Sequence, residues 1–590
     1  MKYYAIKKCK WLVLALMISC FLPTEAQIKI NEGTTIDIPS GTYMITGTSL
    51  TVNTGGDLDL RGMATINGSL TNNAGASGFT VESDATGTGS LIMSGSASSN
   101  ITFQRYADVY AKGQKWHYVS APVSEQALTT DWMSTNDIGF TDPAWQFFRF
   151  SEINNYWIYF DYEGVAPEPF GDETFVDASG YCLTRTSDGV LSFSGTPITE
   201  NVSYAATYTV DEGSGFNLVG NPFTSFLNAT SDAHANNNFI TANEALLDDS
   251  YKALYIWDEA ADYEYGSQDY RVINNAVVTG NAIDQDYIAP GQAFMVKVVS
   301  PGGNLAFNTN MQAHNTAAAY KSKEVWPSVE LTITGNGNSN STAIGFNTGM
   351  TDGLDPSYDA AKFKGNPNLA LYTKLVDDKG KDFAIQVLPE QNSEDLPFRL
   401  AIPSLRSGLQ TRDAGSDRGS QPSTNNRDFA IQALPDQDIE NYIIPIGVDV
   451  AESGVFEFSA LQENLDNYSL FLEDRHENTF IDLRWDTYFA TISESGTGRF
   501  YLHFKDATAI GEIIPETNVS FSVLAGQIII QNPDKEKGTI SLVNVSGQVL
   551  GMYEMNGNSR QEFSINQATG IYIINIQTEK AAISRKVFLR

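Results

Sequence analysis

The fold class is decided by a stretch near the N-terminus, residues 50–66, which reads LTVNTGGDLDLRGMATI. Its apolar residues come in groups of two or three, separated by Gly, Asn and Asp. Such groups are typical of short strands, and none of them follows the 3.6-residue period of a helix. Similar groups recur through residues 28–103. The sequence therefore predicts a β-solenoid-like region over residues 27–104, or a stack of small pleated sheets.

The composition excludes several classes of protein. The chain has 590 residues, of which 70 are acidic and 37 basic, so its formal net charge is −33. A surface this acidic repels phosphate and anionic lipid head groups, so nucleic acid is not an expected partner. No stretch is long and apolar enough to predict a transmembrane segment in the mature chain. Three Cys and five His are too few for a disulfide framework or a zinc scaffold.

The first 26 residues predict a signal peptide. A lysine-rich start precedes an apolar run at residues 11–22, and small residues then predict cleavage between Ala26 and Gln27. The alternative is a lipobox that ends at Cys20, with lipid attached to that cysteine. Cleavage at Ala26 removes four Lys and one Glu, so the mature chain carries −36. A signal peptide predicts that the protein is exported.

An internal duplication predicts two similar β-units over residues 105–315. The aligned segments keep their order along the chain: 116–123 with 216–223, 147–150 with 254–257, and 180–183 with 291–294. Each copy begins with an aromatic strand that ends at Pro and closes with a strand that follows Gly. Cys182 lies in one of these closing strands, and a buried strand residue is the expected role.

Residues 325–505 predict a β-sandwich. Val329, Leu331 and Ile333 alternate with polar residues, which is the period of a strand with one buried face. Inside this region residues 382–391 recur nearly unchanged as 428–437, and a flexible loop is expected over residues 403–427.

A polar linker at residues 506–517 precedes a small domain, residues 518–590. Its predicted strands cover residues 527–531, 538–545, 561–565, 570–577 and 584–589. The fold class is thus all-β and multidomain: a short β-solenoid-like region, then β-sandwich modules, then a small C-terminal immunoglobulin-like β-sandwich.

The last domain resembles the C-terminal sorting domain (type A) of type IX secretion cargo proteins of Bacteroidetes. The resemblance rests on a turn with Asn544 and Gly547, a strand with Gly570 and Tyr572, and a basic C-terminal strand with Lys586, Val587 and Arg590. It departs from the family's pattern at Asn544, where Asp is usual, and at Gln548, where a basic residue is usual.

That resemblance implies export through the periplasm to the outer-membrane surface or the extracellular space. It also implies partners, but no activity. The implied partners are the type IX translocon, a sorting protease that cuts within the linker, and a surface lipopolysaccharide. Residues 351–360 and 472–475 also resemble segments of large cargo proteins whose function is unassigned.

The sequence suggests one metal site and no other cofactor. Asp352, Asp355 and Asp359 lie in one Gly- and Pro-containing loop, where three carboxylates could share a Ca²⁺ ion. Solvated turn residues are the alternative. Trp145, Trp157, Trp257, Tyr263 and Tyr265 could stack on sugars or pack in the core.

No catalytic motif is recognisable, so no catalytic residue is predicted. The favoured function is an adhesin-like surface protein or matrix component that binds an extracellular glycan or protein. The alternative is a secreted glycan-active hydrolase or a carbohydrate-binding protein, because two of the many carboxylates could lie close together.

Overall fold

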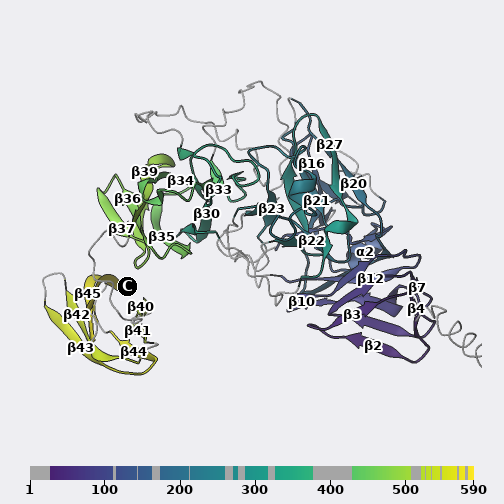
Figure 1. Cartoon of the computed structure of the whole chain (residues 1–590), viewed down its shortest axis with the longest axis horizontal. Helices are drawn as coiled ribbons and strands as arrows, with labels where there is room; N and C mark the ends of the chain where they lie inside the picture. The colour runs from purple at the N-terminus through teal and green to yellow at the C-terminus, as the bar shows by residue number, and fades with distance from the viewer. Residues whose placement is uncertain are drawn as a thin grey trace, which may run out of the picture. The chain divides into compact units, whose positions relative to one another are not determined.

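The computed structural model shows an all-β chain. It describes residues 27–109, 115–141, 144–161, 170, 173–210, 213–258, 270–276, 286–315, 326–376, 428–506, 520–524, 527–532, 535–544, 548–565, 567, 570–578 and 582–589. Contacts divide the chain into two units, Met1–Lys505 and Asp506–Arg590, and each is described by itself (Figure 1). Within the described ranges, no helix has the length and apolar character needed to cross a membrane.

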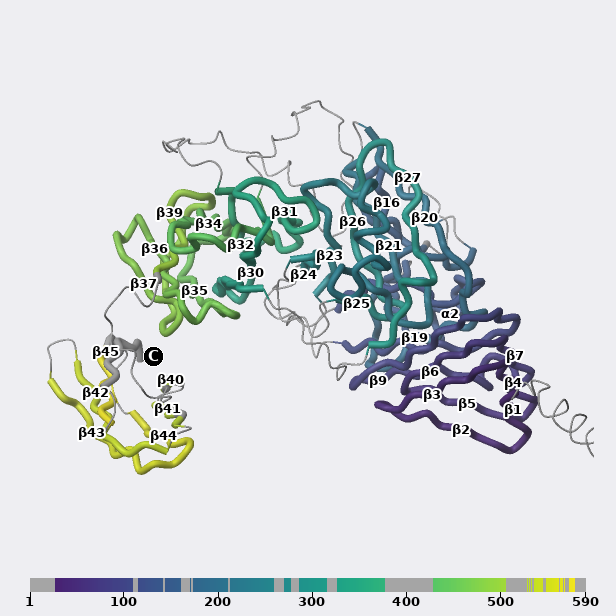
Figure 2. The backbone as a smooth tube through the Cα atoms, viewed as in Figure 1, coloured from purple at the N-terminus to yellow at the C-terminus, as the bar shows by residue number. Residues whose placement is uncertain are grey.

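The chain begins with a β-solenoid of three parallel sheets, in which strands from successive turns of the chain stack in register (Figure 2). Leu50, for example, lies between Ile28 and Leu70 on neighbouring strands. The predicted solenoid-like fold is therefore confirmed. The sheets are β1 (Ile28–Ile30), β4 (Leu50–Val52) and β7 (Leu70–Asn72); β2 (Thr35–Ile38), β5 (Asp57–Leu60), β8 (Phe79–Val81) and β12 (Ile101–Ala107); and β3 (Tyr43–Thr46), β6 (Met63–Ile66) and β11 (Ser90–Met93).

Alternate solenoid residues point into one core, in which leucine and isoleucine are the commonest side chains. Leu58 and Leu60 of β5 are fully buried, whereas the intervening Asp59 is not. Shorter elements connect these strands: η1 (Ala76–Gly78), β9 (Ser83–Asp84) and β10 (Gly87–Thr88).

Two antiparallel sheets with the same strand order follow the solenoid. The first has β13 (His117–Val119), β18 (Tyr181–Leu183), β16 (Ala144–Ser151) and β17 (Tyr156–Asp161), with β15 (Phe140–Thr141) also paired to β16. The second has β21 (Phe216–Gly220), β26 (Ala293–Lys297), β23 (Leu254–Trp257) and β24 (Tyr270–Ile273). The repeated order is what a duplicated chain segment would produce.

Further elements repeat in the same sense. Each copy has a short helix, α2 (Thr130–Thr135) or α3 (Phe239–Ala242), and a strand pair, β12 with β19 (Gly189–Pro197) or β20 (Val202–Thr207) with β27 (Gly302–Phe307). The remaining elements are β14 (Val123–Ser124), β22 (Phe226–Asn228), β25 (Tyr287–Ile288), η3 (Thr309–Met311) and β28 (Gln312–Ala313).

The strand register corrects one predicted alignment. Tyr181 pairs with Val119, and Phe294 pairs with Val219, so Tyr181 corresponds to Phe294. The alignment of residues 180–183 with 291–294 was therefore wrong by two residues. A shift of two leaves every side chain on the same face of a strand, so the hydrophobic pattern alone does not distinguish the two registers.

The sandwich consists of one large sheet folded over its main core. Val329, Leu331 and Ile333 are fully buried in it, as the alternation predicted. The strand order is β37 (Thr479–Asp482), β36 (Tyr468–Asp474), β39 (Gly496–Asp506), β34 (Ile443–Val450), β32 (Leu369–Thr373), β33 (Phe429–Leu434), β30 (Asn338–Phe346), β29 (Ser328–Gly335), β35 (Gly454–Glu463) and β38 (Tyr488–Ile492), with β31 (Ala360–Ala361) beside β33 and η6 (Ile439–Asn441) after it.

The second copy of the short repeat, residues 428–437, supplies β33 and the residues around it. The first copy, 382–391, and the loop 403–427 lie outside the described residues.

The second unit contains two antiparallel sheets around a small core that includes Ile540, Ile574 and Ile576. The predicted strands are present with ends that differ by up to two residues, and the strand Gly570–Thr578 lies centrally, between Lys537–Asn544 and Ala582–Leu589. The sheets are β40 (Ser520–Leu524), β41 (Gln527–Gln531) and β44 (Arg560–Ser564); and β43 (Val549–Asn556), β42 (Lys537–Asn544), β45 (Gly570–Thr578) and β46 (Ala582–Leu589).

Candidate functional site

The candidate site is one face of the sandwich sheet, where β37, β36, β39 and β34 lie side by side. Leu472 of β36 and Leu502 of β39 point into the core. Successive side chains of a strand point to opposite faces, so the residues next to these leucines along each strand point outward. We call the outward set Phe480, Glu473, Arg475, Tyr501, His503 and Ile443 the outer face.

One row of the outer face crosses all four strands. Phe480 pairs with Glu473, and Ile443 pairs with His503. Nε2 of His503 lies 2.8 Å from Oε2 of Glu473, which joins the two pairs. The Phe480 and His503 rings also meet, with centroids 5.3 Å apart. Phe480 is 52% exposed and Ile443 is 46% exposed, so both ends of the row are apolar and accessible.

A second contact pair fixes the guanidinium of Arg475. Its Cζ lies 3.5 Å from the centroid of the Tyr501 ring, and its Nε donates to Oε1 of Glu473 at 3.1 Å. Burial raises the pKa of Glu473, but the hydrogen bonds from His503 and Arg475 outweigh burial and hold this pKa below its ordinary value. Glu473 is therefore an ionised acceptor at neutral pH, flanked by two nitrogen donors.

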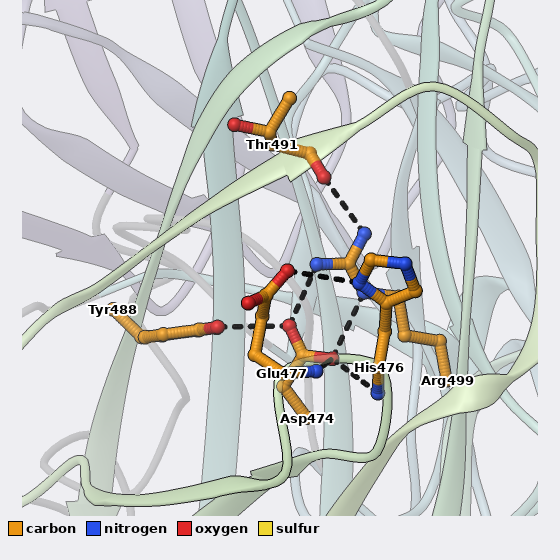
Figure 3. A network of polar contacts seen from close by, with 6 residues as sticks. All are labelled: Asp474, His476, Glu477, Tyr488, Thr491 and Arg499. Atoms are coloured by element: carbon orange, nitrogen blue, oxygen red, sulfur yellow. Dashed lines mark hydrogen bonds and ion pairs between the residues drawn. The ribbon is translucent and has the colours of Figure 1, made fainter.

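A buried carboxylate anchors the end of the strand that carries Glu473 (Figure 3). Asp474 is fully buried, and Arg499 donates to both its oxygens, from Nε to Oδ1 at 2.9 Å and from Nη2 to Oδ2 at 2.7 Å. Tyr488 Oη donates to Oδ2 at 2.8 Å, and the backbone N of His476 donates to Oδ1 at 2.9 Å. We call Asp474, Arg499 and Tyr488 the clasp.

The clasp joins the two ends of the large sheet. Asp474 ends β36, near one end of the strand order, whereas Tyr488 begins β38 at the other end. Arg499 Nη1 also donates to the carbonyl of Thr491 in β38, at 2.7 Å (Figure 3). Burial raises the pKa of Asp474, but the hydrogen bonds from Arg499 and Tyr488 outweigh burial, so this pKa lies below its ordinary value. The clasp therefore holds the folded-over sheet closed beside the outer face.

The predicted calcium residues are bound to different partners. Asp352 accepts from Tyr442 Oη at 2.9 Å, and Asp355 accepts from the backbone N of Thr351 at 2.6 Å. Asp359 is fully buried and accepts from the backbone N of Ala433 at 2.7 Å and of Asp355 at 2.6 Å. Among the described residues, no group of three or more His, Cys, Asp or Glu side chains is placed to hold a metal. The calcium site stays a prediction.

Burial shifts the pKa of Asp359 in this loop strongly. It raises the pKa of Asp359 to about 7, against the opposing effect of the two backbone hydrogen bonds. Since both oxygens of Asp359 already accept bonds from the chain, this carboxyl organises the loop against β33.

Other predicted residues lie in the core or outside the description. Cys182 and Trp257 are buried in one aromatic-rich core cluster, and Trp145 and Trp157 are half-buried. Tyr263 and Tyr265 are outside the described residues.

The sorting residues fall on the second unit. Asn544 ends β42, and its Oδ1 accepts a hydrogen bond from the backbone N of Gln548 at 2.9 Å. Tyr572 is buried in β45, which Gly570 begins, and Lys586 and Val587 lie on β46. Gly547, Arg590 and Ala26 are outside the described residues, and the first described residue is Gln27.

The sequence indicated only part of the outer face. Residues 472–475 resemble a segment of cargo proteins, but nothing singled out Phe480 of the outer face or Arg499 of the clasp. Their signal is weak because the partners are separated in the chain: Arg499 is 25 residues from Asp474. Strand pairing, which the sequence does not show, brings them together.

The fold defines the class of protein. It is a modular all-β protein whose second unit is a small immunoglobulin-like sandwich. Residues 524–590 match the family model described as secretion system C-terminal sorting domain, so the chain is a type IX secretion cargo protein, exported to the cell surface or the extracellular space. Residues 11–405 match another model, and the chain belongs to that family, described as Domain of unknown function (DUF8693).

No curated protein matches the chain. Two similar solved structures are fibronectin type III arrays. A two-domain segment of chicken tenascin is 13% identical, covers 23% of this chain and 94% of its own, and has a TM-score of 0.11. The central array of RIM-binding protein is 8% identical, covers 29% and 81%, and has a TM-score of 0.10.

Proposed function

We propose that the mature protein is an adhesin-like surface protein or matrix component that binds an extracellular glycan or protein. The observation that carries this proposal is the outer face. Its exposed Phe480 ring contacts His503 and lies opposite Glu473. His503 holds the side chain of Glu473 in place, and Tyr501 holds that of Arg475. A fixed set of an aromatic ring, an acceptor and donors is suited to binding, because little side-chain entropy is lost when a ligand docks.

A glycan-active hydrolase would need a different arrangement. It requires two carboxyl groups on either side of the bond to be cut, with the pKa of one of them raised. Asp359 has a raised pKa, but it is fully buried and both its oxygens accept backbone hydrogen bonds. These contacts favour a structural role for Asp359 over a catalytic one. Binding therefore remains the proposed activity.

The proposal extends to how the protein is delivered. Type IX secretion machinery is the partner of the sorting domain. We expect a signal peptidase to cut after Ala26 and a sorting protease to cut within residues 506–517. Attachment to a surface lipopolysaccharide would then retain the protein, and its absence would release it.

The test is a binding screen on the mature chain, residues 27–590, and on residues 27–505, which form a unit by their own contacts. A glycan array and a panel of extracellular-matrix proteins are probed in millimolar Ca²⁺ and in chelator. Saturable binding by both forms supports the proposal. Hydrolysis of an array glycan, or saturable binding that requires residues 506–590, contradicts it.

A further inference from the structure

We propose that the outer face binds a neutral polysaccharide chain along the row from Phe480 to Ile443. This inference rests on the proposed binding function and names the ligand and the residues. The row crosses four strands, so it extends over about 14 Å at the usual spacing of neighbouring strands. That length suits several linked sugars better than one.

The apolar ends of the row match the apolar faces of sugar rings. Phe480 is 52% exposed, and its contact with His503 holds the ring in one orientation. Aromatic rings contribute large contact areas with few rotatable bonds, so an exposed ring held in place is a suitable platform for the C–H face of a pyranose. At the other end, Ile443 offers a second apolar contact, 46% exposed.

The polar groups between these ends match hydroxyl groups. Glu473 is an acceptor, and Arg475 has donors to spare beyond the one that bonds to Glu473. A sugar hydroxyl both donates and accepts, so neighbouring hydroxyls on one ring can bond to the carboxylate and the guanidinium together. Because Arg475 is stacked on Tyr501 at 3.5 Å, its N–H groups keep a defined plane.

Charge favours a neutral ligand over an anionic one. The whole chain carries −33, which repels polyanions in general. On the outer face Glu473 and Arg475 are in direct contact, so they offset each other and leave no strong local field. A polyanion would meet the Glu473 carboxylate, whereas a neutral glycan uses both groups.

The clasp holds the backbone that carries two residues of the outer face. Asp474 directly follows Glu473 and precedes Arg475 in the chain, and the five hydrogen bonds to its carboxylate fix the backbone between them. Pre-organised groups lose less entropy on binding, and this loss often limits affinity for flexible glycans.

The experiment is affinity electrophoresis of the mature chain in gels containing neutral polysaccharides (glycogen, mannan, hydroxyethylcellulose) or anionic ones (polygalacturonate, heparin). We expect retardation by at least one neutral polymer. Phe480→Ala and Glu473→Gln should each weaken it about tenfold or more, a loss near 1.4 kcal/mol. Phe489→Ala is the matched control, because Phe489 is 42% exposed on β38, outside the outer face. It should bind like the unchanged chain.

The outcomes separate this inference from the proposed function. Retardation by neutral polymers that Phe480→Ala and Glu473→Gln leave unchanged overturns the outer-face assignment. Tighter binding to polyanions, or to matrix proteins alone, overturns the ligand class but leaves an adhesin-like function in place. Binding to none of the polysaccharides or proteins overturns both. Melting temperatures of the variants within a degree or two of the unchanged chain show that they fold.

Discussion

Asn136 and Asn243 make the same hydrogen bonds in the two copies of the duplicated module. Asn136 follows α2, and its Nδ2 donates to the carbonyl of Trp132, whereas its Oδ1 accepts from the backbone N of Ser192 at 2.6 Å. Asn243 follows α3, and its side chain bonds in the same way to Phe239 and to the backbone N of Ala306, at 2.7 Å. Each asparagine thus joins a helix end to a long strand.

Replacing either asparagine should loosen its own copy. Asn136→Ala leaves the backbone N–H of half-buried Ser192 without its acceptor, which costs about 1 kcal/mol, the lower end of the cost of an unsatisfied buried group. Hydrogen exchange should then quicken in β19, and Asn243→Ala should have the same effect in β27. Asn236→Ala, at an exposed position in the same region, is the control and should leave both strands unchanged. Unchanged protection of β19 in Asn136→Ala would contradict the prediction.

The clasp should contribute strongly to the stability of the sandwich. Arg499→Ala leaves the fully buried carboxylate of Asp474 without its cation, and breaking a buried pair on one side costs about 3–5 kcal/mol. Chemical denaturation followed by tryptophan fluorescence, to which Trp485 between β37 and β38 contributes, measures this loss.

A second arginine–aspartate pair in the same sandwich provides the control. Arg484 bonds to Asp482 with both partners partly exposed, so Arg484→Ala should cost under about 1 kcal/mol. Equal losses for Arg484→Ala and Arg499→Ala would show that burial of Asp474 is not decisive.

The clasp also shows where prediction from sequence reached its limit. Period-two alternation identified the strands that bury Val329 and Phe500, because a strand with one buried face has that pattern wherever its neighbours lie. The contact of Asp474 with Tyr488 depends on how a ten-strand order folds over, and no local pattern encodes this. The solenoid was predicted from its turns, but its in-register stacking needs the structure.

Asp359 should make stability depend on pH near neutrality. Its pKa is about 7 in the folded chain and near 3.8 when unfolded, so the folded state binds more protons between these values. The free energy of unfolding should therefore fall as the pH rises from about 4 to 7, by up to about 1.4 kcal/mol per unit for one proton. Asp359→Asn should remove this part of the slope between pH 5 and pH 7. Identical slopes in both proteins would refute the assignment.

The repeated segment predicts that residues 382–427 can be removed. Thr373 pairs with Phe429, and Lys374 bonds to Asp428 at 2.6 Å, so the chain leaves and returns at adjacent points. Deleting residues 382–427 joins Lys381 directly to Asp428 and shortens the connection. Loop-closure entropy then favours folding by about 1–2 kcal/mol, so the melting temperature should hold or rise. A large fall would contradict this prediction.

A second deletion of equal length tests the fit of β33. Removing residues 392–437 retains the first copy, so the product differs from the other deletion only by Val387 for Ala433 and Glu390 for Asp436. Ala433 is fully buried, and two added methyl groups should cost about 1–3 kcal/mol through overpacking. The second deletion should therefore melt below the first, and the reverse order would show that the site of Ala433 has room for valine.

The last strand of the chain should be required for export but not for folding of the first unit. β46 forms a full antiparallel ladder with β45, from Gly570 opposite Leu589 to Gln577 opposite Ala582, and it is an edge of its sheet. Deleting residues 584–590 removes most of that ladder and the end of the matched sorting domain. Since Met1–Lys505 has its own cores, we expect folded protein to accumulate in the periplasm of the producing cells. Surface proteolysis and fractionation measure where it is, and limited proteolysis of the periplasmic form shows whether it is folded. Normal surface display of the truncated chain would mean that this strand is an ordinary terminal strand with no part in sorting.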